Sequence, residues 1–491
     1  MLNRIANLFK KQPAEIRSFS GAQKNPWNKD LLFSAVRTNE DIQRNLNSLR
    51  NASRELAKNS GDYRKYIKMC LRNIVGANGV TLQMDCRKSN GEIDEATNNY
   101  IEERWRNFCL FGRSTASKQG TFRDLLKMII RTQRVDGECF IRRLPNFNNS
   151  NRYAFQILDA AACPVDLNIM LSNGNRIVMG VELNQWNEEV AYYFGKREKC
   201  DLETGKDFDG VYSPNNPQLN GRFLRIEADE INHYFEPEFV GQVRGFPFGQ
   251  AAIQELHLLN AYFYAELVAA KAASCKLGAL VKNDAPATYG GRNSAKAENK
   301  QPVELSPGSV DVLYGGWDFK SYDPQHPSQN FPPYVKAMKR NIANGLDVAY
   351  NGFANDLESV NFSSMRGGVL DERDAWMDAQ ETLIENFLKP EFAKWLRVQM
   401  LMRDWKIGIN ADWENCSVWL ARRWQWVDPR ADAEANLIQI AMGATTPQDV
   451  AANLGNDFAD NAEKITKALE LLGAAKQFIE TQESIKQAVG K

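Results

Sequence analysis

Residues 241–249 read GQVRGFPFG, and the character of the chain changes at this stretch. Before it, short runs of β-branched and aromatic residues alternate with Asn, Gly and Pro, a pattern that favours strands and turns. After it, Ile253, Leu256, Leu259 and Phe263 recur at three- and four-residue steps, the period of a helix. The stretch therefore predicts a boundary between an α+β unit and a long helix.

Helices dominate the chain beyond this boundary. The apolar faces of 249–275 and 332–350 predict two long helices. Residues 276–331 between them are polar and rich in Pro and Gly, so we expect a small insert with short strands. A polar loop at 351–363 leads into a third long helix, over about 370–388, which Pro390 should break or bend.

The chain before the boundary predicts mixed secondary structure. Helical rhythm covers 41–75, 92–108 and 121–134. A strand is expected to begin near 80–84, and further strand patterns cover 139–143, 153–158, 176–183, 190–194 and 222–226. Asp136-Gly137-Glu138 predicts a turn with both carboxylates in water, not a catalytic pair.

The last part of the chain carries clear helix boundaries. Asp428-Pro429 predicts the start of a helix and Gly443 its end. Thr446-Pro447 and Gly455 predict the start and end of the next helix. We therefore expect a small helical domain over 428–491.

Composition limits the classes of function. The chain has 491 residues, enough for about two to four domains, and 43% of them are hydrophobic. Lys plus Arg and Asp plus Glu number 61 each, so there is no cationic excess for holding phosphates tightly. Any contact with nucleic acid must therefore be local or weak.

Several sequence features of enzymes, metal proteins and exported proteins are missing. The eight cysteines form no CxxC pair, and no apolar run approaches the roughly 20 residues of a membrane span. Segment 2–11 lacks the apolar core of a signal peptide. We expect reduced thiols, assembly in a reducing cytoplasm, and no metal or membrane.

Catalytic and cofactor-binding motifs are also missing from the sequence. It contains no GxxxxGK[ST], GxGxxG or GxSxG. The three histidines, His233, His257 and His326, are far apart, and we expect His257 to be a partly buried polar residue of the first long helix. The sequence predicts no enzyme and no cofactor.

A set of ordered motifs resembles one known family. GQVRGFP at 241–247 matches its GQxRGxP element, and NFSSMR at 361–366 matches NYSSxR with Phe362 in place of Tyr. VDGECF at 135–140 and WVDP at 426–429 resemble its DGE turn and W-DP start. Over about 16–460 the chain resembles the lambda-type portal proteins of tailed bacteriophages.

The resemblance implies a portal fold with an α+β wing, long stem helices, a small α/β clip and a helical crown. It divides the chain into a polar N-terminal leader at 1–26, the wing at 27–248, a stem helix at 249–275, the clip at 276–331, a second stem helix at 332–350, a tunnel loop at 351–363, a long helix returning to the wing at 364–427, and the crown at 428–491.

The resemblance also implies a structural role. About twelve copies would close into a ring through head-to-tail interfaces. The ring would occupy one capsid vertex of the virion, after assembly in the host bacterial cytoplasm. Double-stranded DNA would pass through it without sequence preference during packaging and ejection. The terminase ATPase, head-tail connectors, and major capsid and scaffold proteins would be its partners. Another virion assembly protein, a connector or minor head protein, is the alternative.

Candidate site residues follow from these assignments. The tunnel loop would present Asn351, Asn355, Asp356, Glu358 and Asn361 to DNA as a weakly repulsive collar. The second stem helix carries Lys336, Lys339 and Arg340 at helical spacing, either as a basic belt facing DNA or as an ordinary solvated or subunit-facing surface.

Two further sets are expected to contact proteins. Arg244 and Arg366 lie inside family motifs, and we favour a place in subunit interfaces over a phosphate grip. The expected clip contacts with terminase or connectors are Arg292, Lys296, Glu298 and Lys300.

Overall fold

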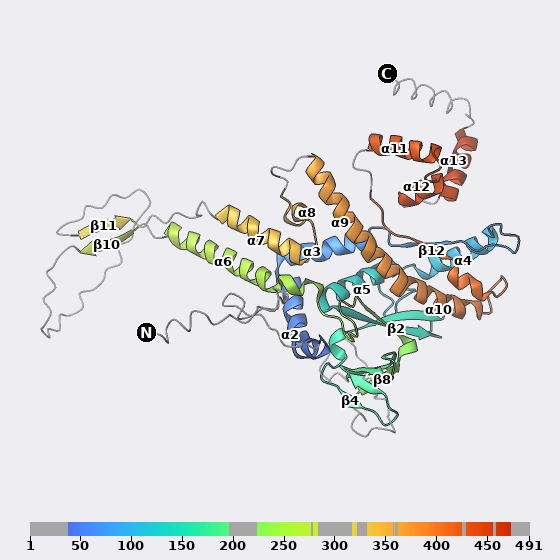
Figure 1. The fold of residues 1–491 in the computed structure, drawn as a ribbon, viewed down its shortest axis with the longest axis horizontal. Coiled ribbons are helices and arrows are strands. Elements are labelled where there is room, and N and C mark those ends of the chain that lie inside the picture. The colour runs from blue at the N-terminus through green and yellow to red at the C-terminus, as the bar shows by residue number, and fades with distance from the viewer. Residues whose placement is uncertain are drawn as a thin grey trace, which may run out of the picture.

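The computed structural model describes residues 38–195, 223–275, 278–282, 317–321, 331–356, 358, 362–424, 429–454 and 458–472. An α+β body and a long two-helix arm make up most of this part (Figure 1). The predicted α+β class is confirmed.

Helices form the first part of the body. They are α2 (Thr38–Asn59), α3 (Gly61–Cys70), a π-helical turn (Leu71–Val75), α4 (Glu95–Phe108) and α5 (Phe122–Asp136). Capping explains where α5 lies. Thr121 and Asp124 form a reciprocal capping box at its start, and Gly137, with φ 90°, ends it. The three predicted helical stretches are confirmed.

Antiparallel sheets form the rest of the body. One sheet has the order β3 (Tyr153–Leu158), β2 (Glu138–Pro145), β9 (Ile231–Phe235). A second has the order β4 (Ile169–Met170), β5 (Arg176–Val178), β6 (Val181–Leu183), β7 (Glu189–Gly195), β8 (Phe223–Glu227). Strand β1 (Thr81–Met84) pairs with β12 (Ser417–Leu420), far along the chain. Single 3-10 turns lie at Ala160–Ala162, Ala228–Glu230 and Ala411–Asn415.

The predicted strand at 176–183 is in fact two strands. β5 and β6 pair antiparallel, with Val178 opposite Val181. Met179 and Gly180 between them both have positive φ, 48° and 83°, and form the turn. A Cβ at Gly180 would lie 2.8 Å from the sulfur of Cys163, so glycine is needed there for space as well as for conformation. The alternation of apolar residues continues through this turn and hid it in the sequence.

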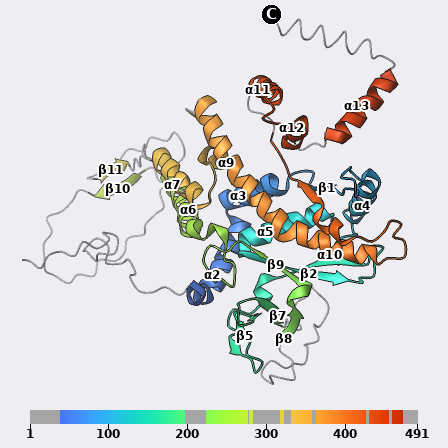
Figure 2. The same ribbon diagram turned by 45° about the vertical axis from the view of Figure 1, so that its right-hand side comes forward.

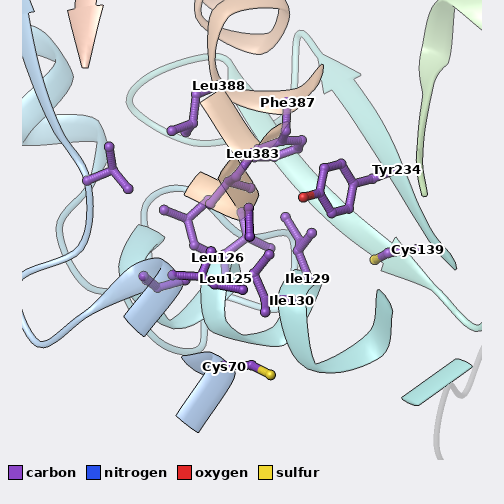
Figure 3. Packing of buried hydrophobic residues seen from close by; sticks show 14 of the residues in the cluster. Cys70, Leu125, Leu126, Ile129, Ile130, Cys139, Tyr234, Leu383, Phe387 and Leu388 are labelled. Atoms are coloured by element: carbon purple, nitrogen blue, oxygen red, sulfur yellow. The ribbon is translucent and has the colours of Figure 1, made fainter. Parts of the chain in front are cut away.

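The core lies where α5 packs between the sheets and the long helical segment at 362–400. Leu125, Leu126, Ile129 and Ile130 of α5 are buried beside Leu383, Phe387 and Leu388 (Figure 3). Trp105 of α4 joins the same core, with its ring centroid 4.9 Å from that of Trp395. Segments far apart in sequence therefore share one core.

A two-helix arm leaves this body. A 3-10 turn (Phe248–Ala252) leads into α6 (Ile253–Cys275), and α7 (Phe331–Gly345) returns beside it, with the rings of Tyr262 and Phe331 5.7 Å apart (Figure 1, Figure 2). At the far end, β10 (Gly278–Lys282) pairs antiparallel with β11 (Trp317–Ser321). The expected order of helix, insert with short strands, and helix is confirmed.

Two boundaries after the arm differ from the prediction. The second arm helix ends at Gly345, not near 350, because the chain turns at Asp347, whose φ is 53°. A separate short helix, α8 (Tyr350–Ala354), then occupies the start of the expected loop, and α9 (Phe362–Leu383) begins eight residues earlier than expected, within NFSSMR.

Pro390 does not end the long helix. After α9, a π-helical turn (Ile384–Leu388) continues into α10 (Lys389–Met400), whose first turn holds Pro390. Proline has no N–H to donate to the Asn386 carbonyl four residues earlier. The side-chain amide of Asn232 donates to that carbonyl instead, at 3.0 Å. A neighbouring strand thus replaces the missing helical hydrogen bond.

The C-terminal helices that the structure describes are α11 (Pro429–Ala441), α12 (Pro447–Asn453) and α13 (Phe458–Leu472). The first two begin as predicted. Gly443 follows α11 with φ 73°, and Thr446 and Asp449 bond reciprocally at the start of α12. Asp428 and Gly455 lie outside the described residues.

Within the described ranges, no helix has the length and hydrophobicity to cross a membrane.

Candidate functional site

The predicted belt and the predicted tunnel loop contact each other at the base of the arm. The ammonium of Lys336 on α7 lies 2.8 Å from Asp356 Oδ2, and the Tyr350 hydroxyl donates to the same oxygen at 2.7 Å. These two hydrogen bonds, Lys336 first, lower the pKa of Asp356 to about 2. The guanidinium of Arg340 sits over the Tyr350 ring at 5.3 Å.

The other belt residues also have partners inside the chain. The Lys339 ammonium lies 3.3 Å from Asp62 Oδ1 of α3, and Lys65 of α3 donates to Asn355 Oδ1. Asn355 has φ 55°, a conformation that Asn tolerates better than most residues. Belt, loop and α3 therefore form one polar junction. Sequence reasoning missed Asp62, Lys65 and Tyr350, because no local pattern links α3 to this loop.

The remaining predicted site residues divide into two groups. Asn351 is half-buried in α8, whereas Asn355 and Glu358 are exposed. Asn361 and the clip residues Arg292, Lys296, Glu298 and Lys300 lie outside the described residues. Arg366 lies in the second turn of α9. The structure brings together the tunnel loop and the belt. The roles expected for Asn361, Arg366 and the four clip residues remain predictions.

A buried charge cluster joins the VDGECF motif at 135–140 to the GQVRGFP motif at 241–247. Arg244 of GQVRG binds Glu138 of β2 through Nε at 2.8 Å and Nη2 at 2.6 Å. Arg50 of α2 binds the same carboxylate, and His233 Nε2 lies 3.0 Å from it. The other His233 nitrogen lies 3.1 Å from Glu189. Glu138 and Arg244 are both wholly buried.

Two expectations about these residues are wrong. Asp136 and Glu138 are not in water, since Asp136 is only 6% exposed and binds Arg54 through both of its oxygens. Arg244 is not in a subunit interface, because its own chain covers its side chain completely. The guanidinium joins a carboxylate to the Cys163 and Met179 carbonyls, but all these groups belong to one chain.

The charges in the cluster stabilise one another. Burial alone would raise the pKa of Glu138, but the positive charges of Arg244 and Arg50 hold it well below its usual value. Burial opposes protonation of His233, yet its hydrogen bonds with Glu138 and Glu189 raise its pKa. Because the side chains of Glu138, Arg244 and His233 are shielded from solvent, the cluster is structural.

His257 is not partly buried as expected. It lies exposed on α6, because the buried positions of that helix are Leu256 and Leu259. Within the described part of the chain, no three His, Cys, Asp or Glu side chains are placed to hold a metal ion.

Comparisons with known proteins agree on one family. Residues 27–380 match the model of the lambda family of phage portal proteins. A probable portal protein of Halomonas phage phiHAP-1 is 31% identical over 93% of this chain and 87% of its own length. Portal protein B of Escherichia phage lambda is 19% identical over 75% of this chain and 73% of its own.

Solved structures of gene transfer agent particles are also similar to this chain. They include the neck of the native gene transfer agent particle computed with C12 symmetry, with TM-score 0.42, and the neck of the empty particle with C6 symmetry, with TM-score 0.43. Their identities are 14% and 15%, and each match covers 84% of this chain and 94% of the other. Because the family model matches residues 27–380 and a probable portal protein is 31% identical over 93% of the chain, the chain belongs to the lambda family of phage portal proteins.

Proposed function

We propose that this portal protein forms a closed ring of about twelve copies at one vertex of a capsid. Double-stranded DNA passes through the ring during packaging and ejection. The observation that carries this proposal is the family match over 27–380, which extends across both arm helices and the insert between them. The projecting arm supports the assignment of α6 and α7 to the stem (Figure 1).

The DNA path follows the base of the arm. The loop after α8 presents Asn355 and Glu358 as exposed polar groups, and Asp356 beside them is balanced by Lys336. A collar built from such units carries little net charge for each subunit. DNA is then neither held by many ion pairs nor strongly repelled.

The protein acts without catalysing a reaction. The sequence has no phosphate-binding loop of a recognised kind, so the energy for DNA movement comes from a terminase ATPase that docks on the clip. Head-tail connectors later occupy the same end. Arg292, Lys296, Glu298 and Lys300 are the proposed contacts, and Arg366 remains a proposed interface residue. The ring assembles in the host cytoplasm and is incorporated into the virion.

Electron microscopy of the purified full-length protein tests the proposal. Closed rings with an axial hole are expected. Smaller or open assemblies would favour a connector or minor head protein, and compact monomers would contradict both structural roles.

A further inference from the structure

Two arginines lie over the ring of one tryptophan where the chain leaves the body toward α11, and two further arginines lie on the adjoining segments. Trp424 follows β12, and the guanidinium groups of Arg373 from α9 and Arg422 each lie 5.8 Å from its ring centroid. Arg72 from the π-helical turn after α3 lies beside them, and Arg423 reaches Gln380 of α9 at 3.1 Å. Three segments far apart in sequence thus supply one basic, aromatic surface, which we call the Arg-Trp surface.

Within the part of the chain that the structure describes, Arg72, Arg422 and Arg423 have no carboxylate partner. The Arg422 guanidinium donates to the Arg72 carbonyl and, at 2.9 Å, to Asn73 Oδ1. Arg72 Nε donates to the Lys68 carbonyl at 3.1 Å. Over the described ranges, Arg72, Arg422 and Arg423 bond only to neutral oxygens, and Asp432 of α11 acts electrostatically on Arg373.

Neighbouring positive charges oppose the protonated state of Arg422. Burial lowers the pKa of Arg422, and the neighbouring charges of Arg72 and Arg373 lower it further. The buried arginines Arg50 and Arg244 are paired with carboxylates, whereas the described structure gives Arg422 only neutral partners. An anion from outside the chain would relieve this repulsion.

The geometry suits phosphate oxygens. Arg72 is exposed, and Arg373, Arg422, Arg423 and Trp424 are half-buried, so each of these side chains is at least partly exposed to solvent. Stacking on an indole fixes the plane of a guanidinium, and its paired N–H groups match two oxygens of one phosphate. Several such groups side by side match the closely spaced phosphates of a duplex, one charge per roughly 1.7 Å of axis.

We propose that the Arg-Trp surface contacts the sugar-phosphate backbone of double-stranded DNA passing through or stored above the ring. This inference rests on the proposed function and adds a DNA contact outside the tunnel loop and belt. The contacts carry no sequence information, because they reach phosphates and not base edges. They are few, so salt screens them readily and the duplex still slides.

Binding of short duplex DNA to purified full-length rings, measured against salt concentration, tests this surface. Arg72→Gln with Arg423→Gln should lower the slope of log affinity against log salt by about 0.9 for each phosphate no longer neutralised, and so by about 1.8 for each copy that contacts the duplex. Arg72→Lys with Arg423→Lys keeps the charge and should retain most of the slope. Lys88→Gln with Arg131→Gln removes two exposed charges elsewhere and should leave the slope unchanged.

The possible outcomes distinguish a failure of the proposed DNA contact from a failure of the proposed ring. Rings of the Gln variant that keep the wild-type slope would overturn the DNA contact and leave the proposed function standing. Rings that dissociate in the Gln variant and persist in the Lys variant would assign the surface to acidic groups of a second copy, which also overturns it. A wild-type protein that forms no ring would overturn the proposed function itself.

Discussion

Gly245 and Glu138 lie 107 residues apart in the sequence, and the Gly245 backbone N–H donates a hydrogen bond to Glu138 Oε2 at 2.9 Å. The two segments touch so closely that a Cβ on Gly245 would lie 2.2 Å from the Gly137 carbonyl oxygen. GQVRGFPFG therefore packs tightly against the start of β2 just before the arm begins. This contact ties the segment before the arm to the sheet of the body.

Removing the charge of Glu138 should destabilise the body strongly. Glu138→Gln leaves Arg50 and Arg244 buried without a counter-charge, which we expect to cost about 3–5 kcal/mol of the free energy of unfolding. Urea denaturation measures this loss. Glu103→Gln changes an exposed glutamate of α4 and is the matched control. Equal stability of the two variants would show that the cluster does not hold the junction.

The close approach at Gly137 should tolerate no side chain. Its φ is 90°, and an added Cβ would lie 2.1 Å from the Phe246 carbonyl carbon. Gly174 has nearly the same φ, 86°, but open space around it. We expect Gly174→Ala to cost about 1–2 kcal/mol from backbone strain alone. Gly137→Ala should exceed about 4 kcal/mol or prevent folding.

Thermal unfolding should be measured for both glycine variants. Gly174→Ala introduces backbone strain alone, whereas Gly137→Ala introduces the same strain and a steric clash. A Gly137→Ala protein as stable as the Gly174→Ala protein would mean that the two motifs separate easily, which their close packing does not allow.

His233 should make stability depend on pH. Its pKa is raised in the folded protein, so its stabilising contribution is complete below the unfolded value of about 6.5 and is lost as pH rises through the folded pKa. His233→Gln should therefore lower the free energy of unfolding most at acidic pH, and the difference from wild type should shrink toward alkaline pH. His257→Gln, which replaces an exposed histidine of α6, is the matched control. A difference in the free energy of unfolding between wild type and His233→Gln that grows as pH rises would contradict a protonated His233 in the folded protein.

Reversing the charge of the loop should impair DNA handling. Asp356→Lys with Glu358→Lys breaks the contact with Lys336 and places new cations beside the proposed DNA path. We expect rings to form and packaging or DNA retention to fall, as measured by the yield of DNA-filled heads.

A charge exchange separates pairing from DNA contact. Lys336→Asp with Asp356→Lys restores the ion pair with the charges exchanged. If the pair positions the loop, this variant should package more DNA than the double-lysine variant. DNA-filled heads at wild-type yield from the double-lysine variant would remove the loop from the DNA path.

Local patterns predicted most of the elements. Capping residues and apolar periodicity identified α4, α5, α6 and the starts of α11 and α12, because these signals lie within one or two turns of the chain. The turn at Met179-Gly180 was missed because the apolar alternation of β5 and β6 continues through it. The end of α7 was placed late because Asp347 adopts positive φ without being a glycine.

Long-range contacts could not be predicted in the same way. Glu138 was expected in water because its partners, Arg50, His233 and Arg244, come from distant segments. Likewise, nothing near Pro390 indicates that Asn232 supplies the missing donor. Sequence periodicity reports which face of an element is buried, but not which distant charge meets it there.

A reconstruction of the purified full-length protein by electron cryomicroscopy decides whether many copies of this chain surround DNA. We predict a closed ring in which α6 and α7 of every copy line an aperture wide enough for a DNA duplex, with the loop after α8 at its edge. A reconstruction in which these helices are packed inside a single compact particle, with no passage between copies, would contradict the proposed conduit.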